Sequence, residues 1–350
     1  STSTKYGIFD IEKKDMVIEK ELLHSREELA PFEKITDQGE FREKIIVDAF
    51  KDAGYTISDL SAISARGGLL HPIPGSVYAV NQAMTDDLSE SRYGEHASNL
   101  GAIIALKLSK EANVPAFIVD SVSVNEMEEP AKVSGHPKIE RIVRAHNLNI
   151  RRTAREVAHK IGKEFREINM VGVHLGGGIS VVAIKKGRFI DVNNALLGEG
   201  PFTTERAGTL PIEGLMDMCF NSGMTMAEVK REFTKKSGLM GYIGTSDLRE
   251  VEDRVVAGDK DAIFYLDAMA YRVAKSIGEM STVLEGDVSA IFLTGGMARC
   301  PQLVEGIEKR VSFICQVVLF PGQFEMIALA EGAVMALEEK EEIHEYKKEL

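Results

Sequence analysis

The chain has 350 residues and a formal net charge of −12, and this length favours two domains of ordinary size. Nucleic acids and anionic membranes need a basic surface, which no stretch provides, and no apolar run approaches the roughly 18 residues of a membrane span, so we expect neither as a partner and no export signal. Cys219, Cys300 and Cys315 form no disulfide set or metal-ligand spacing, which favours buried thiols in a reducing cytoplasm.

Short β-rich runs alternate with long amphipathic segments along the chain, which is the pattern of an α/β protein. Residues 40–53 are predicted to form a helix, because apolar side chains recur on one face and Gly54 supplies a left-handed stop. Residues 150–165 are predicted to form a second helix, whose apolar face would cover a sheet. The charged residues 338–350 are predicted to form the solvated end of a last helix.

One order of elements occurs twice. The first half contains "STSTKYGIFDIEKKDMVI", "LSAISARGG" and "PAFIVDS", and the second half contains "MVGVHLGGGISVVAIKKGRFIDV", "VSAIFLTGGM" and "CQVVLFPG". Each series reads as a hairpin, a strand that ends in paired glycines, and a further strand, so a duplicated α/β domain is the economical explanation. By analogy with residues 171–175, which precede the glycines of the second series, a strand is expected before Ser1.

Three turns in these series suit a nucleotide. A hairpin turn built of glycine, serine and threonine points backbone N–H groups at one spot, as a phosphate oxygen requires. The turn "HLGGGIS" at residues 174–180 and the turn "STSTK" at residues 1–5 have this composition. At Gly295 and Gly296 the missing side chains would let a flat ring approach the backbone. Each motif alone is more often plain turn chemistry, but three in duplicated positions favour nucleotide binding, although neither a P-loop nor a Rossmann pattern is present.

Further strings resemble the butyrate kinases over essentially the whole chain, among them "SARGGLLHPIPG", "YGEHASNLGAIIA", "PAFIVDSVSVNEM", "IDVNNALLGEGPF" and "ERAGTLP". These kinases belong with acetate kinase to the superfamily of sugar kinases, heat-shock ATPases and actin. The resemblance implies an α/β fold of duplicated ribonuclease-H-like (actin-like ATPase) domains that flank a nucleotide cleft. It divides the chain into an acid-substrate domain at residues 1–145, a nucleotide-binding domain at 146–325, and a C-terminal helix at 326–350 that is expected to pack back on the first domain.

The activity that the resemblance implies is a reversible transfer of the γ-phosphoryl group of ATP to a short-chain carboxylate, such as butyrate or isobutyrate, which gives an acyl phosphate and ADP with the help of Mg²⁺. The carboxylate is ionised at neutral pH, because its pKa lies near ~4 to 5, and it needs no general base. The site must instead neutralise charge and align the reacting atoms. A cytoplasmic homodimer or higher homo-oligomer is also expected from the family.

Four residues are the catalytic candidates that the resemblance gives. Arg66 matches the arginine that meets the substrate carboxylate, which a planar guanidinium can contact with two donors, and Arg206 matches an arginine near the transferring phosphoryl group. Asp120 matches an essential aspartate, which we interpret as a ligand of Mg²⁺ or of its waters. His146 matches a histidine that donates to phosphoryl or carboxylate oxygens. The arginines could instead be structural ion-pair partners, and the histidine a core or capping residue.

The resemblance also gives substrate, metal and nucleotide residues. His96 and Gly67 would bind the substrate together with Arg66, and Glu325 aligns with a glutamate attributed to Mg²⁺ binding, although stabilisation of a helix N-terminus is an equal alternative. His174 directly precedes the phosphate turn and is counted with the nucleotide site, but we interpret it as structural. The other residues assigned to ATP or ADP are Ser1, Thr2, Ser3, Lys5, Gly176, Gly177 and Gly178 at the phosphates and Gly295 and Gly296 at adenosine.

Two departures from the family keep alternatives open. The family's chain starts earlier, with a strand and an Asn-Pro-Gly that lead into Ser-Thr-Ser-Thr, and this sequence contains neither. Arg144 and Ala145 stand where the family usually has an aromatic residue, which could loosen the substrate pocket. The alternatives are an N-terminally truncated ATP-binding relative with little or no kinase activity, and a sugar kinase or sugar-responsive repressor of the same fold. The acid chain length depends on packing that the sequence does not give.

Overall fold

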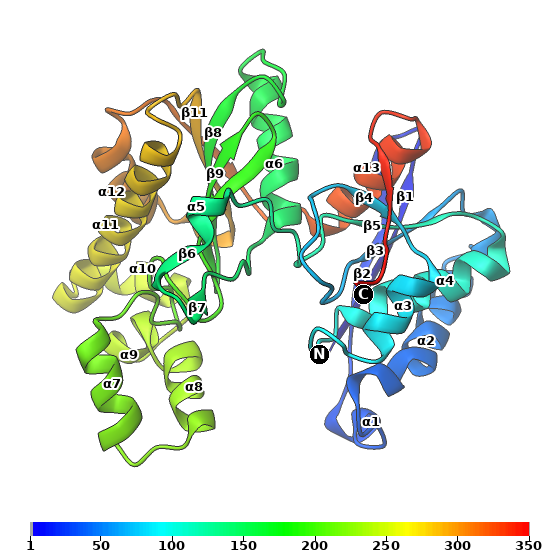
Figure 1. Cartoon of the computed structure of the whole chain (residues 1–350), viewed down its shortest axis with the longest axis horizontal. Coiled ribbons are helices and arrows are strands. Elements are labelled where there is room, and N and C mark those ends of the chain that lie inside the picture. The colour runs from blue at the N-terminus through cyan, green and yellow to red at the C-terminus, as the bar shows by residue number, and fades with distance from the viewer. Residues whose placement is uncertain (1–2, 350) are drawn as a thin grey trace. The chain divides into compact units, whose positions relative to one another are not determined.

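The computed structural model describes residues 3–349. The chain divides into two compact units, of which the first comprises Ser1–Asn125 and Phe324–Leu350 and the second comprises Glu126–Gln323 (Figure 1). The second unit is therefore one continuous segment, and the first unit is completed by the C-terminal residues.

The division between the units differs from the predicted one, because it follows residue 125 rather than residue 145. The segment between these positions holds α5 (Glu129–Lys132), β6 (Val133–His136) and β7 (Ile139–Glu140). The amide of Glu128 donates to the carbonyl of Ile190 at 3.0 Å, and the guanidinium of Arg141 lies 2.9 Å from the carboxylate of Asp191. These contacts fix the segment to the second unit.

The described residues of the first unit, 3–125 and 324–349, form two sheets. The antiparallel pair β1 (Ser3–Asp10) and β2 (Asp15–Leu23) forms one, and the other has the order β13–β4–β5–β3. The strands of the second sheet are β3 (Ile63–Arg66), β4 (Val77–Ala79), β5 (Ala116–Val119) and β13 (Ile343–Glu345). Because β3 and β5 run parallel, with Arg66 opposite Val119, their carboxyl ends meet at one edge of the sheet.

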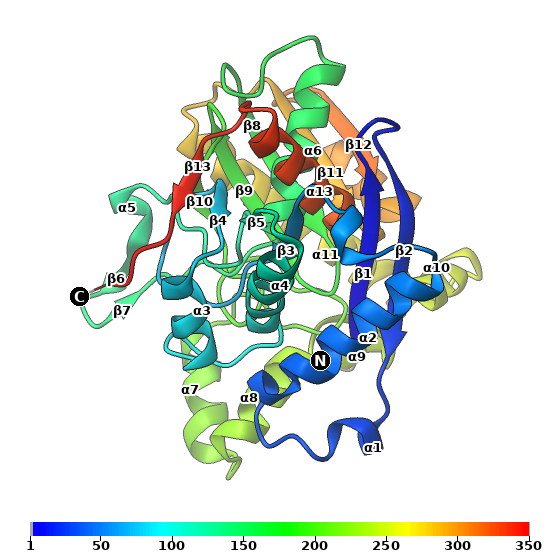
Figure 2. The ribbon, with the colours of Figure 1, turned by 90° about the vertical axis from the view of Figure 1, so that its right-hand side faces the viewer.

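Helices lie beside these sheets in the first unit (Figure 2). The helices are α1 (Arg26–Leu29), α2 (Gly39–Asp52), α3 (Gln82–Ser89), α4 (Asn99–Ala112) and α13 (Glu325–Leu337), with short 3₁₀ turns at Ile35–Gln38 and Ile57–Asp59. The helix predicted at residues 40–53 is confirmed as α2, and Gly54 follows it with a φ of 83°. Gly332 of α13 packs directly on β5, because an added Cβ would lie 2.6 Å from a methyl carbon of Val119.

The predicted helix through residues 326–350 is wrong beyond its first half. The helix α13 ends at Leu337, and β13 pairs in parallel with β4, with Ile343 opposite Val77. Tyr346 follows this strand and is only 2% exposed. Backbone pairing does not depend on side-chain polarity, so a charged segment that reads as solvated can still add a strand to a sheet.

The second unit is built on a five-stranded sheet of order β10–β9–β8–β11–β12. Its strands are β8 (Asn169–Leu175), β9 (Ile179–Lys185), β10 (Arg188–Val192), β11 (Ala290–Gly295) and β12 (Val317–Pro321). Alternate residues of β8 enter two different cores: Val171 and Val173 belong to the cluster with α11, and Met170 belongs to the cluster with α6. The sheet is thus buried on both faces, which explains its nearly continuous apolar strands.

Helices cover both faces of this sheet and extend beyond it. The helices of the second unit besides α5 are α6 (Asn147–Lys160), α7 (Ile212–Asn221), α8 (Met226–Lys235), α9 (Gly238–Ile243), α10 (Leu248–Val256), α11 (Lys260–Val283) and α12 (Pro301–Val311), with a 3₁₀ turn at Gly296–Arg299. The helix predicted at residues 150–165 is α6, but it ends five residues earlier, at Lys160. Gly162 follows with a φ of 70°, which ends the helix.

The repeated order of elements is confirmed in outline. The hairpin β9–β10 of the second unit has its counterpart in β1–β2, and the parallel pair β11–β12 has its counterpart in β3–β5. In the second unit β8 joins the hairpin to the parallel pair. Within residues 3–125 and 324–349 the hairpin and the parallel pair belong to separate sheets.

Two expectations drawn from composition have different outcomes. No helix among residues 3–349 is both long and apolar enough to cross a membrane. The expectation that all three thiols are buried is confirmed for Cys300. It is wrong for Cys219, which is exposed at the end of α7, and Cys315 is only partly buried. Amphipathic helix residues can face solvent on their apolar side when a surface is left uncovered, and α7 has such a side.

Candidate active site

The loop after β3 is held in one conformation by surrounding polar groups. The carbonyl of Gly68 accepts a hydrogen bond from Ser121 Oγ at 2.9 Å, and Asn99 Oδ1 accepts one from the amide of Leu69 at 2.9 Å. A Cβ on Gly67 would lie 2.7 Å from Ser121 Cβ. Because this approach leaves no room for a side chain, the predicted substrate residue Gly67 serves the close packing of the loop.

Arg66, the last residue of β3, contacts a predicted metal ligand. Its Nη1 atom lies 3.1 Å from Oε2 of Glu325, the first residue of α13. Both side chains are partly exposed, with 46% and 30% of their side-chain surface accessible. Glu325 also sits where a helix dipole favours an acid, so its predicted alternative role at a helix N-terminus is compatible with the structure.

Asp120 follows β5 and lies at the same sheet edge as Arg66. It is 5% exposed, and its amide donates to the carbonyl of Ser76 at 3.1 Å. Its φ is 40°, a left-handed conformation that is rare for residues other than glycine. Such strain persists only where the surroundings enforce it and is frequent at functional sites.

The remaining first-unit candidates make local contacts. His96 Nδ1 accepts a hydrogen bond from the amide of Ser98 at 3.2 Å, which is the capping interaction of a turn that leads into α4. The carbonyl of Ser3 accepts from Arg42 Nη1 at 2.6 Å. Lys5 pairs across the hairpin with Glu21 at 3.8 Å. Ser1 and Thr2 lie outside the described residues. The proposed roles of these five residues at the substrate or the phosphates stay predictions.

The glycine turn between β8 and β9 touches two predicted catalytic side chains in the second unit. A Cβ on Gly178 would lie 2.5 Å from Arg206 Nη1 and 3.2 Å from His146 Cε1. A Cβ on Gly177 would meet nothing within 4 Å, and one on Gly176 would lie 3.0 Å from His174 Nε2. The turn therefore packs on catalytic candidates on one side and faces open space on the other.

Arg206 is fixed to this turn through Thr203. The amide of Arg206 donates to Thr203 Oγ1 at 3.0 Å, and Thr203 Oγ1 donates to the carbonyl of Gly177 at 2.9 Å. The guanidinium also donates to the carbonyl of Ala195. Burial lowers the pKa of Arg206, yet an arginine stays charged at neutral pH, so the site keeps one cation against the glycine turn.

His146 and His174 form a stacked pair, with ring centroids 4.0 Å apart and planes 9° from parallel. His146 Nδ1 lies 2.9 Å from Ser180 Oγ of β9. His174 is 2% exposed, and burial lowers its pKa from the usual 6.5 to about 4. His174 is therefore neutral at neutral pH. Its neighbour His146 lies next to Gly178 of the glycine turn.

The third glycine motif, at Gly295 and Gly296, contacts the end of β8, directly before the glycine turn. Gly295 has a φ of 89°, and a Cβ there would lie 2.3 Å from the carbonyl oxygen of Leu175. Gly295 and Gly322 exchange backbone hydrogen bonds of 3.0 and 3.1 Å. A Cβ on Gly296 would meet no protein atom within 4 Å. The structure thus brings the ends of β8 and β11 together, as a nucleotide that spans both motifs would require.

Sequence reasoning missed Thr203 and Asn149, whose side chains hold Arg206 and His174. Thr203 lies within "GPFTTERAG" next to a quoted motif, but nothing local indicated that its hydroxyl would reach Gly177. Asn149 lies in a helix that was predicted only to cover a sheet, and its burial to 1% was not foreseen. Among residues 3–349 no group of three or more His, Cys, Asp or Glu side chains could hold a metal.

Comparisons with known proteins agree with this arrangement. Residues 139–312 match the model of the Acetokinase family. Butyrate kinase 1 from Clostridium acetobutylicum is 46% identical over 347 residues, which cover 99% of this chain and 97% of the relative. The crystal structure of an acetate kinase from Porphyromonas gingivalis superposes with a TM-score of 0.76 at 18% identity, over 96% of this chain and 97% of the other.

A propionate kinase from Francisella tularensis superposes with a TM-score of 0.74 at 16% identity, over 95% of this chain and 96% of the other. At these identities the two solved structures show the fold alone. They confirm the expected mixed α/β, two-domain architecture of actin-like ATPases.

Proposed function

This chain belongs to the acetokinase family and is a carboxylate kinase, and on that premise we propose that it transfers the γ-phosphoryl group of ATP reversibly to butyrate, isobutyrate or a similar short-chain acid. The products are an acyl phosphate and ADP. The match covers 97% of the butyrate kinase, which argues against the alternative of an ATP-binding relative without kinase activity. The sugar kinase alternative is not supported, because the relative that is 46% identical is a butyrate kinase.

The observation that carries the proposal is the contact of Arg66 with a carboxylate. Its guanidinium lies 3.1 Å from the carboxylate of Glu325, which supports the proposal that this position can hold a carboxylate. An ionised substrate carboxylate could take the same donors and would be oriented by them. Its oxygen would then attack the γ-phosphorus as the bond from phosphorus to the ADP oxygen breaks, with no proton to remove.

The second unit supplies groups that suit the transferring phosphoryl group. Arg206 and His146 both lie against Gly178, and the turn's backbone N–H groups are suited to phosphate oxygens. We propose that Gly176, Gly177 and Gly178 contact the phosphates and that Gly295 and Gly296 lie along adenosine. Charge neutralisation by a guanidinium is the main catalytic need when an anion attacks a polyanion.

We propose that Asp120 and Glu325 hold a Mg²⁺ ion. Mg²⁺ is usually held by one or two carboxylates together with waters and substrate phosphates, and it does not need a cage of protein ligands. A strand-end carboxylate that is 5% exposed and a helix-end carboxylate next to Arg66 meet that requirement. When bound, the ion would neutralise negative charge on the nucleotide's phosphates.

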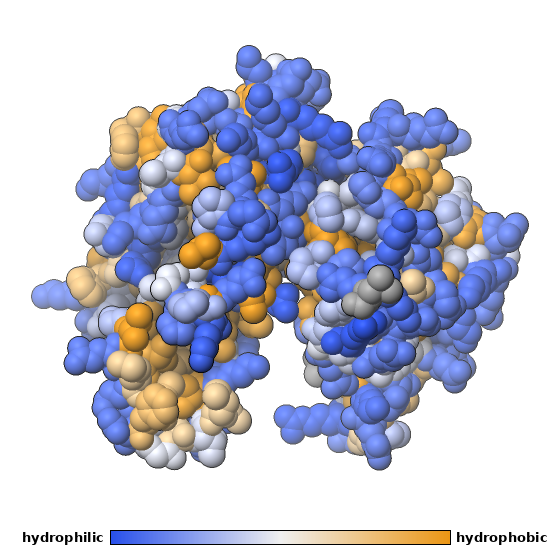
Figure 3. All heavy atoms as spheres, in the orientation of Figure 1, coloured by the Kyte–Doolittle hydropathy of each residue, from blue (hydrophilic) through white to orange (hydrophobic). Residues whose placement is uncertain are grey.

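We also propose that the enzyme is a homodimer or higher homo-oligomer that works in the cytoplasm, where its three free thiols would stay reduced. Support for association comes from α7, which exposes apolar residues at helical spacing: Ile212 is 73%, Met216 is 52% and Phe220 is 81% exposed. Figure 3 shows apolar side chains gathered in the region of this helix. Surfaces of this kind are typical of protein interfaces.

Trapping of the acyl phosphate by hydroxylamine tests the proposal. The purified chain is incubated with Mg-ATP and a series of acids from acetate through butyrate and isobutyrate to hexanoate. We expect hydroxamate to form with a maximum at butyrate or isobutyrate. Absence of hydroxamate with every acid, under conditions where ATP binding is demonstrated by calorimetry, would overturn it.

A further inference from the structure

A buried chain of polar side chains in the second unit has no part in the mechanism above. It joins Asn149 of α6, His174 of β8 and Thr294 of β11, which are 1%, 2% and 0% exposed. Asn149 Nδ2 lies 2.9 Å from His174 Nδ1 and 3.3 Å from Thr294 Oγ1. Polar groups so deeply buried must satisfy one another, so their protons can be assigned by elimination.

A carbonyl oxygen can only accept a hydrogen bond, so it fixes where the neighbouring hydroxyl proton lies. The carbonyl of Gly322 lies 3.3 Å from Thr294 Oγ1, so the threonine hydroxyl donates to it. The hydroxyl has then used its only proton and must accept from Asn149, which requires the amide nitrogen, and not the amide oxygen, to face it. The same NH₂ group directs its other proton at His174 Nδ1, which must therefore be an acceptor.

The neutral ring of His174 then carries its proton on Nε2. This atom faces the phosphate turn, because a Cβ on Gly176 would lie 3.0 Å from it. The opposite tautomer would set an N–H of His174 against the N–H of Asn149 and would leave Nε2 without a proton to donate. A neutral donor also places no positive charge against the ring of His146, which is stacked on it.

We propose that Asn149 is a positioning residue that fixes His174 as the Nε2–H tautomer, so that a neutral donor is directed at the phosphate turn between β8 and β9. The proposal rests on the proposed function for its ligand, the phosphates of ATP or ADP. Its structural core, the tautomer and its cause, stands on the buried contacts alone. Thr294 lies next to Gly295, so the same hydrogen-bonded side chains also reach the end of β11.

The test uses histidine side-chain ¹⁵N NMR on the full chain, which has 8 histidines. The His174 signals are identified by their loss in His174→Gln. In the wild type we expect a protonated Nε2 and an unprotonated Nδ1 at neutral pH. In Asn149→Asp the new carboxylate can only accept at Nδ1, so we expect Nδ1 to become protonated. A wild-type spectrum with the proton on Nδ1 would overturn the proposal even if no variant folds.

Thr153→Val is the matched control, because Thr153 is on the same helix, is 0% exposed, and contacts Thr294 at 3.4 Å rather than His174. We expect it to keep the tautomer and to change the KM for ATP by less than about twofold, whereas Asn149→Asp raises this KM about tenfold through loss of an oriented donor to a charged group. An equal effect of both variants on the KM would contradict the proposal. Because the NMR result is independent of turnover, the tautomer assignment can hold even if kinase activity is absent.

Discussion

The Nη1 atom of Arg66 lies 3.1 Å from Oε2 of Glu325, although 259 residues separate them in sequence. The arginine comes from the end of a strand and the glutamate from the start of a helix. In the proposed reaction the arginine holds the substrate carboxylate, so the glutamate occupies the place that the substrate would take. Substrate binding must then compete with an internal carboxylate.

This competition makes a prediction for Glu325→Gln. A neutral amide binds a guanidinium more weakly than a carboxylate does, so the KM for butyrate should fall about threefold to tenfold. If Glu325 also serves Mg²⁺, kcat falls at the same time. Steady-state kinetics with butyrate varied at saturating Mg-ATP gives both values. Glu338→Gln, at the other end of α13 and paired with Lys340, is the control, and an unchanged KM in Glu325→Gln would refute the competition.

Arg66→Ala and Asp120→Asn should each lower kcat/KM by about a hundredfold or more while leaving the fold intact. Arg66 is half-exposed, so its loss leaves no buried charge unpaired, and asparagine tolerates the left-handed φ of 40° at position 120. Hydroxamate formation measures the activity, and thermal unfolding checks the fold. Arg249→Ala, whose side chain is 88% exposed, should behave as the wild type. Near-normal activity in either site variant would reject its assigned role.

Gly178→Ala and Gly177→Ala should differ, although they are neighbours. At position 178 the new Cβ would lie 2.5 Å from Arg206 Nη1 and 2.9 Å from the carbonyl oxygen of Ala195, so the arginine must shift and kcat should fall about tenfold or more. At position 177 the Cβ meets no protein atom within 4 Å, so any effect there comes from the nucleotide and appears in the KM for ATP. Equal kcat values for Gly178→Ala and the wild type would contradict the assigned contact.

The low pKa of His174 predicts a pH-dependent contribution to stability. The unfolded chain takes up a proton at this residue near pH 6.5, but the folded chain does so only near pH 4. Between these values the unfolded state binds more protons, so the folded state loses up to about 3 kcal/mol as the pH falls through that window. His174→Gln cannot titrate there. As the pH falls from 7 to 4.5, the melting temperature of the wild type should therefore drop by roughly 5 °C more than that of His174→Gln. A constant difference would show that the imidazole is not held neutral.

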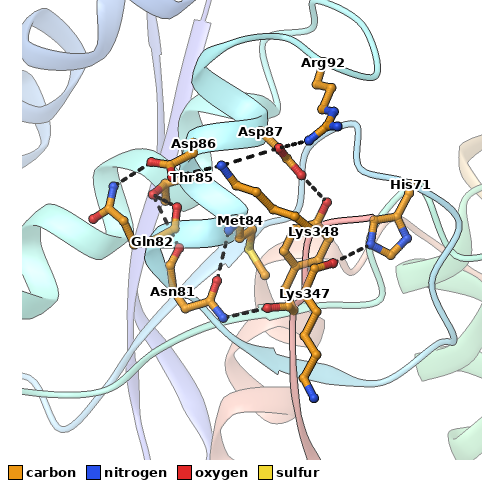
Figure 4. A network of polar contacts seen from close by, with 11 residues as sticks. His71, Asn81, Gln82, Met84, Thr85, Asp86, Asp87, Arg92, Lys347 and Lys348 are labelled. Carbon is orange, nitrogen blue, oxygen red and sulfur yellow. Dashed lines mark hydrogen bonds and ion pairs between the residues drawn. The ribbon is translucent and has the colours of Figure 1, made fainter. Parts of the chain in front are cut away.

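Tyr346→Phe tests how the C-terminal segment is attached to the first unit. Figure 4 shows Asp87, which is 0% exposed, among the polar contacts of α3 and the C-terminal residues. Tyr346 donates to Asp87 Oδ2 at 2.8 Å, and Arg92 contacts Oδ1 at 3.3 Å. Removal of the hydroxyl leaves a buried carboxylate oxygen poorly satisfied and should cost about 1–3 kcal/mol of unfolding free energy, seen as a lower melting temperature.

Lys347→Ala is the control for this prediction, because Lys347 contributes its main-chain oxygen to His71 at 3.0 Å and its side chain extends away from the contacts in Figure 4. A loss of stability in Lys347→Ala as large as in Tyr346→Phe would show that the hydroxyl is not what secures the segment.

Much of the fold could be predicted because its helices and strands follow from local sequence patterns. The apolar runs around Val171 and Ile291, the repeated glycines and the face of α2 all depend on neighbours in sequence. The C-terminal strand could not be predicted, because its partner β4 lies far away in sequence and its composition favours solvent. The end of α6 was misjudged because apolar residues continue past Lys160, although Gly162 offered the stop signal.

The candidate site was predicted as a set of residues but not as a set of contacts. Motifs identified Arg66 and Glu325 separately, and only the tertiary structure shows that they meet. The stack of His146 on His174 and the buried amide of Asn149 were likewise beyond local patterns, because an asparagine in a helix normally reads as a surface residue.

In the proposed reaction a substrate carboxylate oxygen attacks the γ-phosphorus of ATP. ³¹P NMR of a reaction with butyrate labelled by ¹⁸O in its carboxylate tests this directly. We expect a new acyl phosphate signal whose isotope shift reveals ¹⁸O between the acyl carbon and phosphorus, together with ADP. ATP that yields only ADP and unlabelled inorganic phosphate, or that is not consumed with any short-chain acid, would contradict it.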